Sequence, residues 1–283
     1  MKRIAHIAVS LAVSFSLLAC AEEPWETVPS VPALPPPDES GYAPVNDITM
    51  YYEIWNEDGD DPVLLLHGGV GGNQHWGYQV PALVENHKVI AAESRGNART
   101  TSSQQPLSYE LMASDYASLL DYLNIETASV VGWSEGAVVG IEMTLAFPER
   151  IEKLFAFGAN YNLSGIIPNS ENDPVFSAVI AEQTERSRNL SATPDQFEAA
   201  LQQRLDMWAT QPDLKAEELG RITTPTVIAA GDHEETLKPE HTVQLSEMIP
   251  GAKLVLIPNV SHMGLWQDPV AFNKAMTEFL DSR

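Results

Sequence analysis

The sequence predicts an α/β fold with a mainly parallel sheet and helices on both faces. Short, wholly apolar segments recur along the chain, which is typical of strands buried on both faces of a parallel sheet. Segments with helical spacing alternate with these strands, as they do in such folds. A length of 283 residues, of which 44% are hydrophobic, is enough for one large core.

The predicted elements follow in a regular order from residue 48 onward. Residues 48–55 (ITMYYEIW) are β-branched and aromatic, and residues 63–66 (VLLL) are entirely apolar, so both predict strands. Further strands are predicted at 88–92, 128–131, 154–157, 226–230 and 254–257. Helices are predicted at 76–85, 112–123, 136–147 and 272–280. The clearest helical spacing lies in 112–123 and 272–280, where apolar residues recur three or four positions apart.

One interval breaks the alternation. Residues 159–221 show no convincing strand and lie between two predicted core strands. Asp173-Pro174 and Thr193-Pro194 are typical helix starts, since a capping residue precedes a proline in the first turn. The sequence therefore predicts a helical cap insertion over a site at the strand ends, with plain extra packing as the alternative. The side chains that we expect to reach a substrate pocket are Trp133, Phe176, Met207 and Trp208.

The first 41 residues differ in composition from the rest. Residues 1–19 combine a basic start with an apolar run shorter than the roughly 20 residues that span a bilayer, which predicts a secretory signal peptide. The run ends in Leu17-Leu18-Ala19-Cys20, which resembles a bacterial lipobox and implies lipid attachment at Cys20, the only cysteine. A plain secretory signal is the alternative. Prolines are frequent in residues 20–41 and predict a stiff, extended tether, with the folded domain at 42–283.

The charge balance is strongly acidic. The formal net charge is -23, from 39 acidic and 16 basic residues. Such a surface repels nucleic acid and anionic membranes. We therefore expect a small-molecule partner, no nucleic acid, and membrane contact only through the N-terminal lipid. With that lipid, the expected location is the outer membrane, facing the periplasm.

The stretch VVGWSEGAVV, residues 130–139, places one serine between two glycines. A predicted strand ends before Ser134, and a predicted helix begins after it. This strand-turn-helix context is the one that a Gly-X-Ser-X-Gly nucleophile elbow requires, because its sharp turn exposes the hydroxyl at the helix N-terminus. Ser134 is the predicted nucleophile, and the Glu135 backbone N–H is placed to face a developing oxyanion.

A serine hydroxyl is a weak nucleophile and needs a base, which in turn needs a carboxylate. His262 lies in a loop just past the last predicted strand, where the base of this arrangement belongs. The segment Gly231-Asp232-His233-Glu234-Glu235 follows the strand at 226–230 and offers two candidate acids, Asp232 and Glu234. The chain order of serine, acid and histidine is therefore available.

With these residues the chain resembles the α/β-hydrolase family over about residues 48–280. The resemblance is carried by the elbow, by Leu66-His67-Gly68-Gly69, by Gly231-Asp232-His233-Glu234 and by Ser261-His262. It implies the α/β-hydrolase fold and a serine hydrolase mechanism, and we expect no cofactor. No histidine or carboxylate cluster has the spacing of a metal site, so we expect no metal either. In this family the acid usually stands three residues after the glycine, which favours Glu234 over Asp232. The resemblance also implies a second oxyanion donor, the backbone N–H of Gly69 or Val70.

Three functions remain open at this point. The leading hypothesis is a carboxylic ester hydrolase that forms an acyl-enzyme on Ser134. The His-Gly-Gly loop is also similar to that of proline iminopeptidases, so an aminopeptidase or amidase is the second, although Val70 stands where those enzymes usually have proline. A lipoprotein that keeps the fold but only binds a small molecule is the third.

Overall fold

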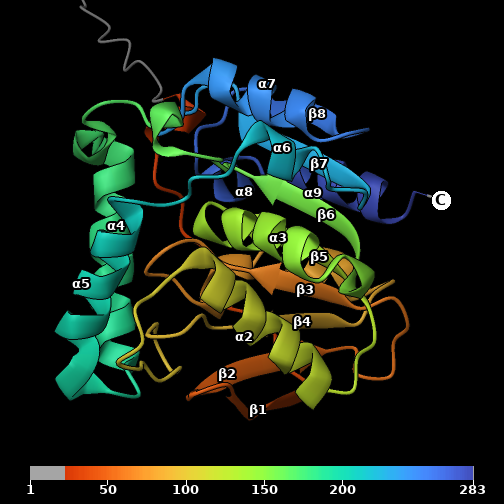
Figure 1. Ribbon diagram of the computed structural model, residues 1–283, viewed down its shortest axis with the longest axis vertical. Coiled ribbons are helices and arrows are strands. Elements are labelled where there is room, and N and C mark those ends of the chain that lie inside the picture. Colours follow the sequence, from red (N-terminus) through yellow and green to blue (C-terminus); the bar gives the residue numbers. More distant parts are fainter. Residues whose placement is uncertain (1–22, 283) are drawn as a thin grey trace, which may run out of the picture.

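The computed structural model describes residues 23–282, so the predicted signal peptide and Cys20 lie outside the described residues. Its centre is one eight-stranded sheet of order β1-β2-β4-β3-β5-β6-β7-β8 (Figure 1). The strands are β1 Glu39–Val45, β2 Ile48–Trp55, β3 Val63–Leu66, β4 Val89–Ala92, β5 Ala128–Trp133, β6 Ile151–Phe157, β7 Thr226–Gly231 and β8 Lys253–Ile257. β1 and β2 pair antiparallel at one edge, and β4, β3, β5, β6, β7 and β8 pair in parallel. The predicted mainly parallel sheet is confirmed.

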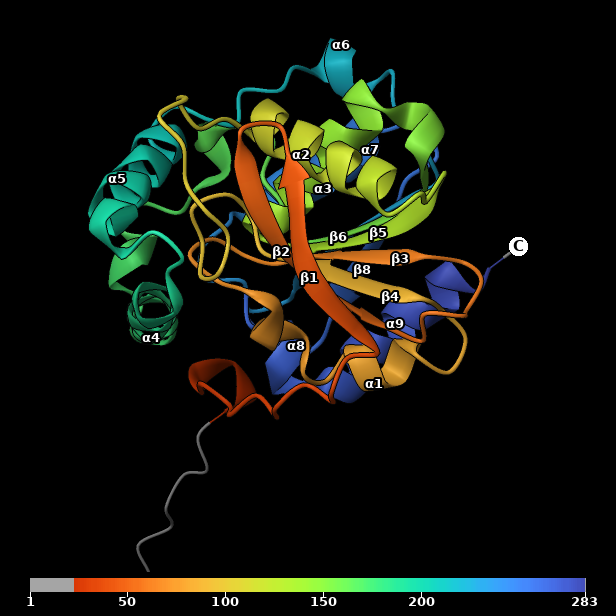
Figure 2. The ribbon, with the colours of Figure 1, turned by 90° about the horizontal axis from the view of Figure 1, so that it is seen from below.

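Helices cover both faces of this sheet. The helices of the described residues are α1 Val80–Leu83, α2 Tyr109–Tyr122, α3 Glu135–Ala146, α4 Pro174–Leu190, α5 Phe197–Trp208, α6 Ala216–Leu219, α7 Pro239–Met248, α8 Gly264–Gln267 and α9 Pro269–Leu280. Short 3₁₀ turns lie at Pro24–Glu26, Asn73–Trp76, Pro148–Arg150, Leu163–Gly165, Ser170–Asn172 and Pro194–Gln196. Figure 2 shows α2, α3 and α7 on one side of the sheet and α1, α8 and α9 on the other.

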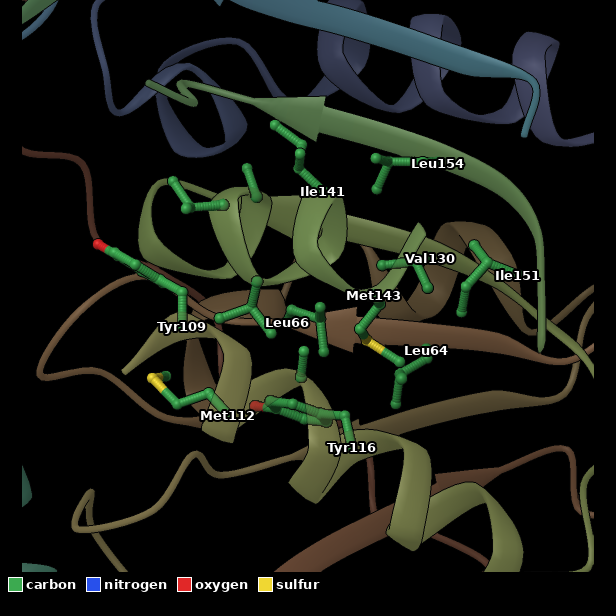
Figure 3. Close-up of a cluster of buried hydrophobic side chains, with 14 of the residues drawn as sticks. Leu64, Leu66, Tyr109, Met112, Tyr116, Val130, Ile141, Met143, Ile151 and Leu154 are labelled. Carbon is green, nitrogen blue, oxygen red and sulfur yellow. The ribbon is translucent and has the colours of Figure 1, made fainter. Parts of the chain in front are cut away.

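The core is divided into two layers by the alternation of side chains along the strands. Leu64 and Leu66 of β3 join the cluster under α2 and α3, where Tyr116 and Leu154 also pack (Figure 3). Leu65, between them, joins the opposite cluster, which α1, α8 and α9 cover. Strands buried on both faces have no polar side, which explains their wholly apolar sequences.

Some elements differ from the prediction. The helix expected at 76–85 is a 3₁₀ turn followed by the four-residue α1, while β1 and α7 were not predicted. β1 contains Gly41 and Pro44, which weaken a strand signal but are tolerated at a sheet edge. α7 buries His241, Thr242 and Ser246 besides Leu245, so its hidden face carries little apolar periodicity.

The insertion between β6 and β7 forms a helical cap, with α4 and α5 side by side at one end of the sheet (Figures 1 and 2). Asp173 caps α4 by accepting hydrogen bonds from the N–H groups of Val175 and Phe176, as the Asp-Pro pattern predicts. The Thr193-Pro194 start instead opens a 3₁₀ turn, and α5 begins three residues later at Phe197.

The proline-rich segment packs against the domain. Residues 24–38, which we call the strap, lie against the body of the domain. Trp25 stacks on His233 with ring centroids 3.6 Å apart, and Trp55 Nε1 donates to the Pro35 carbonyl at 2.9 Å. Packing thus begins before the predicted boundary at residue 42. An extended proline-rich chain leaves its carbonyls unpaired, so side chains of the body can donate to them.

Candidate active site

Four loops at the carboxyl ends of the parallel strands meet at one site. The His-Gly-Gly loop follows β3, Ser134 follows β5, Glu234 follows β7 and His262 follows β8. The chain first runs from β3 to the neighbouring β4 and then returns to the other side of β3 with β5. The reversal leaves a crevice at the carboxyl ends of β3 and β5, where α/β proteins commonly bind ligands.

Ser134 stands on the tight turn that the sequence predicts. Its backbone has φ 56° and ψ -121°, a strained conformation for a residue with a side chain, and its N–H donates to the Phe157 carbonyl at 2.8 Å. The two flanking glycines are required by close backbone contacts. A Cβ on Gly132 would lie 2.4 Å from the Gly136 carbonyl oxygen, and one on Gly136 would lie 2.0 Å from the Leu66 carbonyl oxygen.

The structure brings Glu234 to His262. The imidazole Nδ1 lies 2.9 Å and 3.0 Å from the two carboxylate oxygens, and both side chains are almost fully buried. Thr236 donates to the same carboxylate from its hydroxyl, at 2.5 Å, and from its N–H, at 3.0 Å. Burial alone raises the pKa of Glu234, but the His262 charge and these hydrogen bonds lower it below its ordinary value.

The same contact acts on the histidine in the opposite sense. Burial alone lowers the pKa of His262, but the Glu234 charge and hydrogen bond outweigh it and hold this pKa above its ordinary value. A Nδ1–H donated to Glu234 leaves Nε2 as the acceptor in the neutral ring. The pair therefore has the tautomer and the counter-charge that a general base needs.

Asp232, the rival acid, lies elsewhere. Its side chain is 39% exposed, and it accepts a hydrogen bond from the Asn259 N–H at 2.7 Å. Its own N–H still pairs with the Ile257 carbonyl of β8, so the chain has not yet turned toward the site. Glu234 comes after that turn, which is why the two carboxylates face different surroundings.

Sequence reasoning missed Glu235 and Gly158. The Glu235 carboxylate accepts hydrogen bonds from the His262 backbone N–H at 2.8 Å and from the Ser261 hydroxyl at 3.2 Å. Glu235 therefore holds the loop that carries His262. Burial, together with the Glu234 charge, raises the pKa of Glu235. Gly158, with φ 68°, passes beneath the imidazole, where a Cβ would lie 2.7 Å from His262 Cε1. The run of two glutamates after a strand is the signal that could have marked Glu235.

The candidate oxyanion donors lie on two loops. Glu135 is the first residue of α3, so its N–H has no partner within the helix. Within residues 23–282, the N–H groups of Gly69 and Val70 also have no acceptor. Gly69 borders the cavity beside Ser134, whereas Val70 is buried and does not line it. The structure thus places Gly69 and Glu135, rather than Val70, at the site.

His67 fixes the shape of the His-Gly-Gly loop. Its Nδ1 lies 2.7 Å from the Gly68 carbonyl, and its Nε2 accepts the Ser94 N–H at 2.9 Å. Burial lowers the pKa of His67 to about 4, so the ring is neutral at neutral pH and donates from Nδ1. This histidine is a structural support of the loop and not a second base.

A cavity of about 430 Å³ opens between the strand ends and the cap, and both Ser134 and His262 line it. Of the predicted pocket residues, Trp133, Phe176 and Trp208 line it as well. Met207 does not, because neighbouring helix positions face different directions and Met207 turns into the core cluster under α2 and α3. No group of three or more potential metal ligands gathers anywhere in residues 23–282. No helix in that range is both long and apolar enough to cross a bilayer.

Comparisons with known proteins agree with this fold. Among curated proteins, "Putative carbamate hydrolase RutD" of Azorhizobium caulinodans is 27% identical over 84% of this chain and 97% of that protein. Among solved structures, an enol-lactonase from Burkholderia xenovorans aligns with a TM-score of 0.69 and 23% identity, over 86% of this chain and all of that one. A thermophilic esterase from Thermogutta terrifontis aligns with the same TM-score and 22% identity, over 86% of this chain and 98% of its own. Residues 63–275 match the alpha/beta hydrolase family. Because that match covers most of the sequence, the chain belongs to the alpha/beta hydrolase family.

Proposed function

We propose that the protein hydrolyses carboxylic esters through an acyl-enzyme on Ser134. The observation that carries the proposal is the buried His262–Glu234 pair, which opens on the same cavity as the strained Ser134. In this mechanism Ser134 attacks the acyl carbon while His262 takes its proton and then returns it to the leaving alcohol. A water molecule then attacks the acyl-enzyme, with His262 again as the base, and the carboxylic acid product is released from Ser134.

The charge that develops during attack is placed near unpaired backbone donors. The N–H groups of Gly69 and Glu135 stabilise the oxyanion, and the N-terminal end of α3 adds its dipole. Glu234 stabilises the imidazolium that forms on the other side. Each of the two charges of the transition state therefore has candidate stabilising groups at the site.

The cavity favours an apolar acyl group. Most of its lining is apolar, including Phe176, Ile180 and Leu237. Glu135 also borders it, but both of its carboxylate oxygens already accept hydrogen bonds from the cap helix α5. An aminopeptidase needs a free carboxylate for the substrate ammonium; Glu135 does not offer one, and the exposed Glu171 of the lining is the remaining candidate, which the anilide in the panel below tests. A cavity of about 430 Å³ also suits a small molecule.

A substrate panel on the full chain tests the proposal. The similar proteins are named as a carbamate hydrolase, a lactonase and an esterase. The panel therefore compares p-nitrophenyl butyrate with an alkyl carbamate and a simple lactone, and prolyl-p-nitroanilide is added to test the aminopeptidase alternative. We expect the butyrate to be cleaved with a kcat/KM on the order of 10⁴ M⁻¹s⁻¹ or more. Ser134→Ala should lose roughly 10³-fold or more.

Other outcomes favour the other functions. Faster cleavage of the anilide would indicate an aminopeptidase or amidase. If no substrate is cleaved and an alkyl fluorophosphonate does not label Ser134, the chain is a binding protein that keeps the fold.

We also propose that the protein is exported and carries a lipid on Cys20. The support is the lipobox-like sequence Leu17-Leu18-Ala19-Cys20 after an apolar leader. Cys20→Ser should abolish labelling by a radioactive fatty acid and move the protein from the membrane to the soluble fraction. Unchanged fractionation of the variant would refute the proposal.

A further inference from the structure

A buried ion pair joins the nucleophile elbow to the cap. Glu135, the residue after Ser134, pairs through Oε1 with the Arg204 guanidinium of α5, and each side chain is only 2% exposed. Arg204 also donates from Nη2 to the Arg95 carbonyl at 2.8 Å. The pair therefore spans from the catalytic turn to the cap without contact with solvent.

The second oxygen of the same carboxylate holds a tryptophan of the cavity wall. Trp208 lies one helical turn after Arg204 on α5, and its Nε1 donates to Glu135 Oε2 at 2.7 Å. The indole covers the His-Gly-Gly loop so closely that a Cβ on Gly69 would lie 2.2 Å from Trp208 Cζ2. Trp208 thus forms the part of the cavity wall nearest to a candidate oxyanion donor.

Few other buried side chains fix α5. Its buried residues are Phe197, Arg204 and Met207, and only the last two lie in the half that faces the site. A buried ion pair adds little net stability compared with an apolar pair of equal size, because both charges lose their hydration. What it supplies here is a single orientation, since a carboxylate with two fixed donors admits few arrangements.

We propose that Glu135 is a positioning residue that, together with Arg204, sets Trp208 as the specificity-determining wall of the acyl pocket. The inference rests on the proposed ester hydrolysis. Held by its N–H, the indole limits the length of the acyl group that can reach Ser134. An indole without this hydrogen bond can rotate away and lengthen the pocket.

The direct test is Trp208→Phe, which keeps an aromatic ring and removes the N–H. We expect kcat/KM for p-nitrophenyl octanoate relative to butyrate to rise about tenfold, since each pocket methylene is worth roughly that much. The melting temperature should change by only a few degrees. Trp76→Phe is the matched control, because Trp76 is fully buried and does not line the cavity. It should leave the ratio unchanged.

A mutant cycle separates positioning from packing. The background Glu135→Leu with Arg204→Met replaces the ion pair by apolar side chains of similar size, which preserves folding in other proteins. The octanoate-to-butyrate ratio should already be raised in this background, and adding Trp208→Phe should change it by less than about twofold. Independent, multiplying effects of the two changes would overturn the inference.

Alkyl fluorophosphonates of two chain lengths provide a readout that needs no turnover. The ratio of their labelling rates at Ser134 should shift in Trp208→Phe as the ester ratio does. If the native protein is labelled and cleaves esters but neither ratio shifts, the positioning role is wrong while the proposed function stands. If the native protein neither reacts with the probes nor cleaves esters, both are wrong.

Discussion

At the scale of single residues, the site depends on which carboxylate meets His262. Glu234 contacts Nδ1 with both oxygens inside the protein, whereas Asp232 is partly exposed and holds a loop. A charge acts far more strongly on its neighbour when water is excluded. The two acids are only two positions apart in the sequence, but they lie in different surroundings.

Neutralising each acid tests this assignment. Glu234→Gln should lower kcat by roughly 10³- to 10⁴-fold, because the imidazolium loses its counter-charge and the imidazole its tautomer. Asp232→Asn should cost at most a few-fold. Steady-state rates of both variants on p-nitrophenyl butyrate measure the difference, and a more damaging Asp232→Asn would reverse the assignment.

The raised pKa of His262 makes a prediction for the pH profile. Only the neutral imidazole can take the serine proton, so kcat/KM should fall as the pH drops through this pKa, which lies above the ordinary value of 6.5. In Glu234→Gln the main counter-charge is gone and burial dominates, although Glu235 still adds a smaller negative field. The acidic limb of the variant should therefore move to lower pH. A limb that stays in place, or moves up, would show that another group titrates.

At the scale of elements, α3 illustrates how a helix is brought close to a sheet. Gly136 faces the Leu66 carbonyl of β3, while Gly140, one turn later, faces the end of the Leu154 side chain. A backbone atom cannot move aside, but a leucine methyl can. The two glycines therefore tolerate a methyl group to different degrees.

Alanine at each position should separate them. Gly136→Ala should destabilise the protein by about 3 kcal/mol or more, or prevent folding, because its Cβ would lie 2.0 Å from a carbonyl oxygen. Gly140→Ala should stay within about 1 kcal/mol, since its gain in helix propensity offsets a shift of Leu154. Urea unfolding of both variants gives the comparison, and equal stabilities would contradict the packing argument.

The elements that sequence patterns predicted are those whose own residues determine them. The wholly apolar β3 and the glycine-flanked Ser134 carry their structural reason within a few positions. α7 was missed because its buried face is polar, with His241 stacked on Tyr161 at 3.9 Å and not on an apolar layer. The Glu135–Arg204 pair could not be predicted, because 69 positions separate its partners and only the folded cap brings them together.

At the scale of the whole molecule, the strap links the N-terminus to the catalytic loops. Trp25 stacks on His233 in the loop that carries Glu234, and the Thr27 carbonyl accepts a hydrogen bond from Gln267 at 3.0 Å. Gln267 in turn accepts the Ser261 N–H at 2.7 Å, next to His262. The strap thus contacts the acid loop directly and is connected to the histidine loop through Gln267 of α8.

Removing the stacked ring tests whether this contact matters. Trp25→Ala should lower kcat about fivefold and the melting temperature by a few degrees, since an aromatic pair is worth roughly 1 kcal/mol. Trp25→Phe should restore most of both losses. Loss of stability without any loss of kcat would show that the strap supports the fold but not the site.

The docked strap also has a consequence for distance. A free chain from Cys20 to residue 42 could extend about 70 Å, at roughly 3.1 Å per residue. With Trp25 fixed on His233, the path from Cys20 to the docked chain is at most about 18 Å. If Cys20 carries a lipid, as proposed above, the Trp25 backbone lies within that distance of the lipid-bearing residue, and the acid loop lies one stacked pair of side chains further. An ester dissolved in the membrane would then need to travel only a few molecular lengths to reach the enzyme, while polar esters would have to diffuse in from the surrounding water.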